Sequence, residues 1–239
     1  MKSFQTALSE AKNIAFLTGA GVSTPSGIPD FKSTDKLWPY KEPRESLLSL
    51  SSFHRNPERF WAVYREVFSS KFNATPNSVH QWIAELEKHK DVRVITQNVD
   101  GLHQKAGSSK VREVHGSNNN AFCRKCNSTV PMKDVMDIKL PRCEKCRKVL
   151  KPGVLLFQES VSDMDGAQED IIKSDMLIVM GTSLETFPIN LIPFYARAYT
   201  TMPIVWVNKD ASPPNYVFDH KIQIELTEFV TIYSHGNES

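Results

Sequence analysis

A glycine-bearing loop near the start of the chain most constrains what it can fold into. The loop follows an apolar run, Ile14–Leu17, which is short enough to be one buried strand. Gly19 and Gly21 would allow a tight turn and a close approach of the backbone to a ligand, and N–H groups exposed there would hold a pyrophosphate. The common dinucleotide fingerprint, G-x-G-x-x-G, needs a third glycine where this chain has Thr24. The loop therefore indicates a nucleotide site that departs from the common fingerprint, with an ordinary Gly/Pro surface turn as the alternative.

The residues that follow predict irregular structure rather than a helix. Pro25, Gly27 and Pro29 stand at alternate positions, and this spacing favours a loop. We therefore expect the nucleotide loop to run directly into a segment that carries an acid, an aromatic ring and a base at 30–32.

Length and charge exclude some classes of function. With 239 residues, 40% of them apolar, the chain can form one large domain, or a main domain with an insert. A formal net charge of +2 is too small to predict binding to nucleic acid or to a membrane by charge. The sequence has no apolar run of about 18 residues, and its first residues lack the apolar core of a signal peptide. We expect a cytoplasmic protein with no nucleic-acid or membrane partner; its oligomeric state is not predicted.

Short apolar runs alternate with helix-like segments along the chain. The expected strands are 14–17, 92–96, 153–157, 176–180 and 204–207. The expected helices are 3–12, one begun by Asn56 and Pro57, one begun at 75–77, 163–173 and 189–199. This alternation predicts an α/β fold with a parallel sheet and helices on both of its faces. Residues 117–151, rich in cysteine and lysine, are expected to be an insert.

All four cysteines fall within that insert. They form two C-x-x-C pairs, Cys123 with Cys126 and Cys143 with Cys146, on either side of residues 127–142. This spacing is typical of a zinc ribbon, in which four thiolates surround one tetrahedral ion and leave no open position for catalysis. A redox dithiol or chance packing is the alternative, but a redox pair would not need a second matched pair. In the cytoplasm metal ligation is favoured over disulfides, so we expect one structural Zn²⁺ per chain.

The strand expected at 92–96 is followed by a run of polar side chains. Gln97, Asn98 and Asp100 would lie at the carboxyl end of that strand, where α/β proteins bind ligands. His115 lies between this strand end and the cysteine-rich insert, which makes it a candidate general base. A packed or surface side chain is the alternative for it, as for the other histidines.

Two more expected strands end in small or polar residues. Gly-Thr-Ser at 181–183 follows the strand 176–180, and its small donors suit a phosphate or a ribose. Asn208 and Asp210 follow the strand 204–207 and could bind ribose hydroxyls. Each signal is weak alone, because Gly-Thr-Ser is common in turns, but three such strand ends together indicate a dinucleotide cleft.

Taken together, these segments resemble the sirtuin family, and within it the bacterial NAD-dependent protein lysine deacylases. The matching segments occur in the family's order and span nearly the whole chain: 19–23, 26–31, 96–100, His115 with Gly116, the four cysteines, 181–184 and 207–208. The resemblance implies a Rossmann-like NAD-binding domain and a smaller domain with a helical module and a zinc ribbon. The first would consist of 1–32, 75–116 and 152–239, and the second of 33–74 and 117–151.

The resemblance also implies an activity. In the family, the carbonyl oxygen of an acyl-lysine attacks the ribose carbon that bears nicotinamide, nicotinamide leaves, and an alkylimidate forms. His115 would act as the base on a ribose hydroxyl, and water would then release lysine and O-acetyl-ADP-ribose. The expected function is therefore NAD-dependent deacetylation of acetylated protein lysines, with NAD as co-substrate.

The same resemblance assigns binding residues. Asp100 would hold the nicotinamide amide, with Gln97 and Asn98 along the nicotinamide ribose. The residues expected to contact NAD are Gly19, Ala20, Gly21, Ser23, Thr24, Asp30, Phe31, Lys32, Gln97, Asn98, Val99, Asp100, His115, Gly181, Thr182, Ser183, Asn208 and Asp210. The residues expected to pair with the substrate peptide as an added strand are Gly153, Val154, Leu155 and Phe157.

Some residues depart from the family's pattern. Lys32 stands where Arg is usual, and lysine lacks the planar fork of a guanidinium. Gln158 replaces a usual glycine beside the peptide edge, and Pro25 is unusual in the cofactor loop. Members that remove succinyl groups carry Tyr-x-x-Arg, and the matching positions here are Trp61 and Tyr64. We expect an apolar acyl pocket lined by Phe31, Trp61, Val154 and Phe157, which would favour acetyl over succinyl.

Other functions fit parts of the pattern. Protein mono-ADP-ribosylation could use the same cleft, although a base such as His115 favours deacylation. A non-catalytic zinc-ribbon protein that senses nucleotides or binds DNA is the alternative of another class, and the small net charge disfavours DNA. The missing third glycine disfavours a hydride-transferring dehydrogenase.

Overall fold

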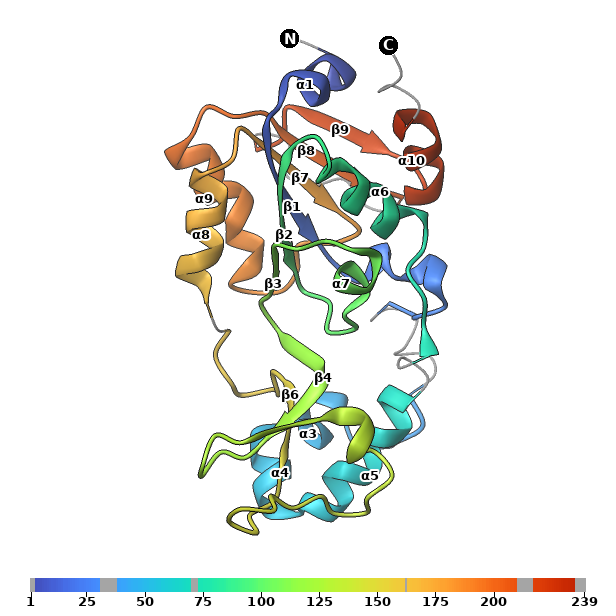
Figure 1. The fold of residues 1–239 in the computed structure, drawn as a ribbon, viewed down its shortest axis with the longest axis vertical. Coiled ribbons are helices and arrows are strands. Elements are labelled where there is room, and N and C mark those ends of the chain that lie inside the picture. The colour runs from blue at the N-terminus through green and yellow to red at the C-terminus, as the bar shows by residue number, and fades with distance from the viewer. Residues whose placement is uncertain (1–2, 31–37, 70–72, 162, 210–216, 235–239) are drawn as a thin grey trace.

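The computed structural model describes residues 3–30, 38–69, 73–161, 163–209 and 217–234, arranged as one large and one small unit (Figure 1). Most residues of the large unit belong to α1 (Phe4–Glu10), β1 (Asn13–Thr18), α6 (Ser78–Leu86), β2 (Asp91–Thr96), α7 (Leu102–Ala106), β3 (Val111–Glu113), α8 (Met164–Ile172), β7 (Met176–Met180), α9 (Ile192–Tyr199), β8 (Ile204–Asn208), β9 (His220–Gln223) and α10 (Leu226–Ser234). The small unit contains α3 (Arg44–Leu47), α4 (Leu50–Arg55), α5 (Pro57–Phe68), β4 (Gly116–Phe122), β5 (Thr129–Pro131) and β6 (Lys151–Val154).

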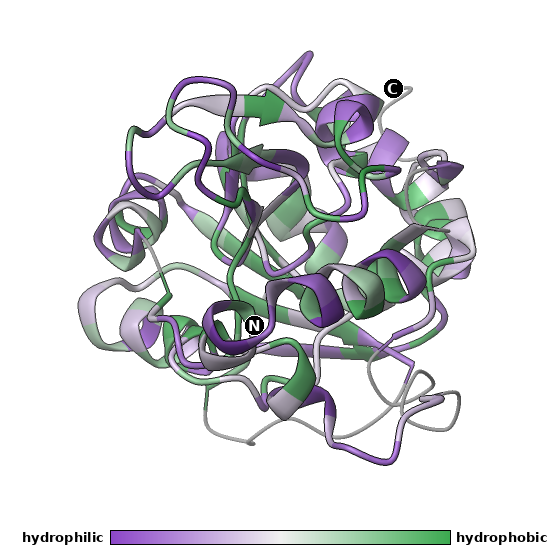
Figure 2. Ribbon diagram, turned by 90° about the horizontal axis from the view of Figure 1, so that it is seen from below, coloured by the Kyte–Doolittle hydropathy of each residue, from purple (hydrophilic) through white to green (hydrophobic). Residues whose placement is uncertain are grey.

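The large unit is built on a parallel sheet with the strand order β3-β2-β1-β7-β8-β9. Residues of its central strands alternate between two cores, so that Phe16 packs with α1, α6 and α10, while Leu17 packs with α8 and α9. Figure 2 shows the result, with hydrophobic strands inside and helices that present hydrophilic residues outward. The parallel sheet with helices on both faces is confirmed.

The direction of winding reverses between β1 and β7. From β1 the chain continues outward to β2 and β3, and from β7 it continues in the other direction to β8 and β9. Ligands of open α/β sheets bind outside the carboxyl ends of the strands at such a reversal. The loops after β1 and β7 should therefore form the centre of the site.

The expected helices begin where their capping residues predict. Asn56 caps α5, its Oδ1 accepting a hydrogen bond from the Arg59 N–H at 3.1 Å, and Pro57 occupies the first turn. Asn77 caps α6 in the same way, through the Val79 N–H at 2.9 Å.

One expected strand lies elsewhere. The run predicted as a strand at 153–157 instead contributes β6, Lys151–Val154, which pairs antiparallel with β4 in a separate three-stranded sheet of order β5-β4-β6. The apolar run suggested a buried parallel strand, but β6 ends at Val154. The Leu155 N–H still donates to His115, next to β4, whereas the Leu156 N–H bonds to Glu159 in the turn that follows. The proposed boundaries at 116/117 and 151/152 stay a prediction; β4 and β6 each begin one residue before them.

None of the helices in the described ranges is long and apolar enough to span a membrane.

Candidate active site

Three glycines bring the loops after β1 and β7 into direct contact. The Gly21 N–H donates to the Gly181 carbonyl at 2.8 Å, and a Cβ added at Gly21 would lie 2.8 Å from the Gly181 Cα. A Cβ on Gly19 would lie 2.7 Å from the Cβ of Thr182, and Gly181 itself has a φ of +61°. Side chains at these positions would separate the loops. The glycines therefore serve loop packing as well as any approach to a ligand.

The loop after β1 forms two short 3₁₀ turns, η1 (Ala20–Val22) and η2 (Thr24–Ser26), and not an α-helix. The N–H groups of Gly19, Gly21, Val22 and Ser23 already donate to carbonyls of the chain. Of the amides at 19–23, that of Ala20 is the one left for a ligand within the described structure. The expected cradle of several free N–H groups is thus much reduced, because the loop uses them to fold.

A buried polar network connects this loop to the end of β2. Asn98 Nδ2 donates to the Gly19 carbonyl and to Ser23 Oγ, both at 3.0 Å. Ser23 Oγ donates in turn to Asp100 Oδ2 at 2.7 Å. The other oxygen of Asp100 accepts the Leu102 N–H at 2.9 Å, so the carboxylate is held in one orientation.

A second network joins the ends of β2, β7 and β8. Gln97 Nε2 donates to Thr182 Oγ1 at 3.0 Å, and Asn208 Nδ2 donates to the Thr182 carbonyl at 3.1 Å. Ser183 beside them is exposed. The two networks therefore bring together most of the residues expected at NAD, from the ends of four strands, β1, β2, β7 and β8.

His115 is half-buried at the edge of this assembly. Its Nδ1–H donates to the Gln97 carbonyl at 3.0 Å, which leaves the lone pair on Nε2. Burial lowers the pKa of His115 below its usual 6.5, and the bond to the carbonyl opposes this shift. The imidazole is therefore neutral near pH 7 and able to accept a proton, which fits the expected general base.

Two more histidines lie behind the loop, and the sequence analysis did not distinguish them. His103 is buried, with Nε2 3.1 Å from Thr18 Oγ1, and its ring centroid is 4.8 Å from that of His80. The His80 Nδ1 accepts the Asn77 N–H at 3.3 Å as part of the cap of α6. Burial lowers the pKa of His80 to about 4 and that of His103 to about 3. Both are neutral packing residues, the alternative considered for them.

The four cysteines form one cluster, whose Sγ atoms lie within 4.8 Å of one another. The two C-x-x-C turns have the same hydrogen bonds: the N–H of Asn127 and that of Arg147 donate back to Cys123 and Cys143, each at 2.8 Å. Asn127 and Arg147 also share a left-handed φ of 57° and 62°. Two matched turns that converge four thiols fit one tetrahedral zinc ion with no open position. The cluster therefore has the ligand set of a structural zinc site.

The segment expected to pair with a substrate peptide is largely occupied by the chain itself. The Leu155 N–H donates to the His115 carbonyl at 2.7 Å, and the Leu156 N–H to Glu159 Oε2 at 2.9 Å. Phe157 exchanges both of its backbone hydrogen bonds with residues 48–50. Strand addition along 153–157 would have to use the remaining groups, such as the carbonyl of Leu155.

Trp61 does not line an acyl pocket. It is fully buried in the core of the small unit, and its Nε1 donates to the Leu150 carbonyl at 3.0 Å. Tyr64 is also fully buried, and its hydroxyl bonds to Asn118. The helical spacing of these residues marks a core face, and the expectation that Trp61 lines the acyl pocket is wrong because its side chain is enclosed in that core.

For several residues expected to contact NAD, the structure gives little information about a place in the site. Phe31, Lys32 and Asp210 lie outside the described residues. Asp30 and Val99 are half-buried, and Thr24 Oγ1 donates to the Gly21 carbonyl at 3.0 Å within the loop.

Comparison with known proteins gives a family for this geometry. Residues 19–188 match the Sir2 family. An NAD-dependent protein deacetylase of Bacillus anthracis is 39% identical over 229 residues, covering 95% of this chain and 94% of that protein. A Sir2 structure with a deacetylated peptide and 3′-O-acetyl-ADP-ribose superposes with a TM-score of 0.85 and 30% identity, over 98% of this chain and 97% of the other. A Sir2 complex with a peptide and NAD⁺ gives a TM-score of 0.87 at 31% identity, over 100% and 99%.

The chain therefore belongs to the Sir2 family.

Proposed function

We infer that this chain is an NAD-dependent protein lysine deacetylase, which removes acetyl groups from protein lysines and produces nicotinamide and O-acetyl-ADP-ribose. The observation that carries this is the neutral imidazole of His115, held by the Gln97 carbonyl at the loops where the strand ends meet. Relatives named NAD-dependent protein deacetylases that align over nearly the whole chain support the same function.

The residues of the strand ends divide the binding of NAD between them. Asp100, fixed by Ser23 and by the Leu102 N–H, would accept from the nicotinamide amide. Asn98 and Gln97 would border the nicotinamide ribose, while Thr182, Ser183 and Asn208 would hold the phosphates and the adenosine ribose. NAD supplies the electrophilic ribose carbon and the departing nicotinamide.

His115 would supply the base. With Nδ1–H bound to a carbonyl, Nε2 can take a proton from a ribose hydroxyl without first losing one. The four thiolates would hold a structural zinc ion away from this chemistry. Cysteines that serve as metal ligands rather than disulfides are typical of a reducing compartment, which supports action in the cytoplasm.

The experiment is mass spectrometry of an acetylated peptide incubated with the protein, with and without NAD. We expect NAD-dependent loss of acetyl and formation of O-acetyl-ADP-ribose. A peptide that gains ADP-ribose and keeps its acetyl group would instead support mono-ADP-ribosylation. No turnover of peptide or NAD would contradict both.

A further inference from the structure

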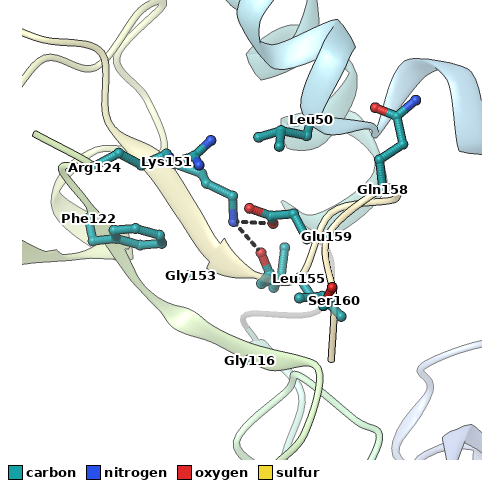
Figure 3. Close-up of a pocket in the computed structure, with 11 residues that line it drawn as sticks. Leu50, Gly116, Phe122, Arg124, Lys151, Gly153, Leu155, Gln158, Glu159 and Ser160 are labelled. Carbon is teal, nitrogen blue, oxygen red and sulfur yellow. Dashed lines mark hydrogen bonds and ion pairs between the residues drawn. The ribbon is translucent and has the colours of Figure 1, made fainter. Parts of the chain in front are cut away.

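A cavity of about 470 Å³ opens beside β6. Its lining includes Gly116, Arg124, Gly153, Leu155, Glu159 and Ser160, and Figure 3 shows them around the ion pair of Lys151 with Glu159. A volume of this size holds an amino-acid side chain together with water.

The cavity lies next to the candidate base. Gly116 directly follows His115, and Leu155 donates its N–H to the His115 carbonyl at 2.7 Å. Successive residues of an extended peptide are about 3.4 Å apart. A peptide whose acetyl-lysine reaches His115 therefore carries a flanking side chain within reach of this cavity, and this step rests on the proposed function.

Lys151 and Glu159 form an ion pair in the cavity wall, and their charges cancel. Lys151 is buried, and its Nζ lies 2.8 Å from Glu159 Oε2 and donates to the Val154 carbonyl at 2.7 Å. The same oxygen accepts the Leu156 N–H at 2.9 Å. Lys151 thus balances the charge of Glu159, and neither member of the pair needs a further ionic partner.

Arg124 also lines the cavity, but it is not part of this ion pair. Its side chain is exposed, and its Nη1 donates to His54 Nε2 at 3.1 Å, an acceptor that must be neutral to receive this bond. Among the described residues, no carboxylate lies within ion-pair distance of Arg124. As far as the structure describes the chain, the cavity therefore carries one uncompensated positive charge, with guanidinium N–H groups left to donate.

We propose that this cavity receives an acidic side chain of the substrate protein, close in sequence to the acetyl-lysine, and that Arg124 selects it. A carboxylate matches the planar fork of a guanidinium and can be bound by two parallel hydrogen bonds. A lysine or arginine at the same substrate position would face the charge of Arg124 and would be repelled.

The test uses peptides that differ at one position, with Glu, Gln or Lys placed in turn at about three positions on either side of the acetyl-lysine. We expect one position at which Glu gives a KM about three- to tenfold lower than Gln, with kcat nearly unchanged, because Arg124 binds the substrate and does not touch the reacting atoms. Lys at that position should raise KM, and added salt should reduce both effects.

Variants then assign the preference to Arg124. Arg124→Gln should abolish it, and Arg124→Glu should reverse it in favour of Lys. Lys125→Gln is the matched control, because it removes the same charge from the next residue, which does not line the cavity. Both positions are exposed, so the fold should be retained.

The outcomes separate this proposal from the function on which it rests. Turnover with no Glu preference at any position, or a preference that Lys125→Gln reduces as much as Arg124→Gln, would overturn the role of Arg124 and leave the deacetylase intact. Peptide affinity measured by fluorescence anisotropy tests the site without turnover: equal affinities for the Glu and Gln peptides at every position would overturn it as well.

Discussion

At the scale of single residues, His115 carries the firmest prediction. His115→Ala and His115→Tyr should lower kcat for deacetylation by about 10²–10⁴, because each removes the proposed base. The measurement is the rate with an acetylated peptide and saturating NAD, with circular dichroism to show that the fold is kept. Turnover by His115→Ala within a factor of about two of the wild type would remove His115 from the mechanism.

Acyl preference is also decided by single side chains. Tyr64 is buried with its hydroxyl on Asn118, and Trp61 is buried against Leu150, so neither presents a charge to an acyl group. We expect kcat/KM for succinyl-lysine to be about ten- to a hundredfold below that for acetyl-lysine, because a carboxylate would lack a charged partner. One peptide bearing acetyl, butyryl or succinyl lysine tests this, with butyryl as the uncharged control. Equal values for acetyl and succinyl would mean that a cation reaches the acyl group.

Residues that act locally could be predicted, and those that act across the fold could not. Asn56 and Asn77 cap helices a few residues away, so their roles follow from the sequence. Gly21 meets Gly181 only after the sheet has formed, and Lys151 meets Glu159 only after the chain turns past β6. His115 could be predicted as a candidate, but the carbonyl that sets its tautomer could not.

At the scale of elements, the contact between the loops after β1 and β7 depends on glycine. Gly21→Ala would place a Cβ 2.8 Å from the Gly181 Cα, with backbone rather than a flexible side chain in the way. We expect a loss of about 1–3 kcal/mol in the free energy of unfolding and a raised KM for NAD. Gly107→Ala is the control, because its nearest neighbour would be 4.0 Å away and its φ of +111° brings only backbone strain. If both variants leave the KM for NAD unchanged, loop contact does not shape the cofactor site.

A structural zinc ion would hold the two C-x-x-C turns together. Cys143→Ser should release the metal and unfold the small unit, since the binding energy of a structural zinc is folding energy. Metal content by atomic emission and the melting temperature measure this, with Ser128→Ala as a control close to the cluster that removes no thiolate. A metal-free protein that melts at the wild-type temperature would contradict a structural role.

Element types were easier to predict than their partners. Short apolar runs predicted β1, β2, β7 and β8, which lie in the centre of the sheet and are largely buried on both faces. The edge strands β3 and β9 are short and half-exposed, so their sequences carry little signal. For β6, a run of apolar residues could not show that its partner is β4 rather than a strand of the large sheet.

At the scale of the whole molecule, His80 and His103 predict how stability depends on pH. Their folded pKa values, about 4 and about 3, lie below the unfolded value of 6.5, so the unfolded chain binds more protons on acidification. Stability should therefore fall as the pH drops below about 6.5, by up to about 1.4 kcal/mol for each histidine at about pH 5.5. Urea midpoints near pH 5.5 and 7.5 test this, with excess zinc because thiolates also take up protons. Identical midpoints would show that these rings are not buried neutral.

The arrangement of the two units also determines where a label or a surface anchor can be attached. Both α1 and α10, the first and last helices, lie at the end of the large unit that is farthest from α4 and α5 (Figure 1). A fusion partner, dye or surface anchor attached beyond either helix would sit away from the small unit and from the cavity beside β6. Immobilised through either of these helices, the protein would present the small unit and the cavity beside β6 to the solution, so the proposed peptide binding could be followed at a sensor surface.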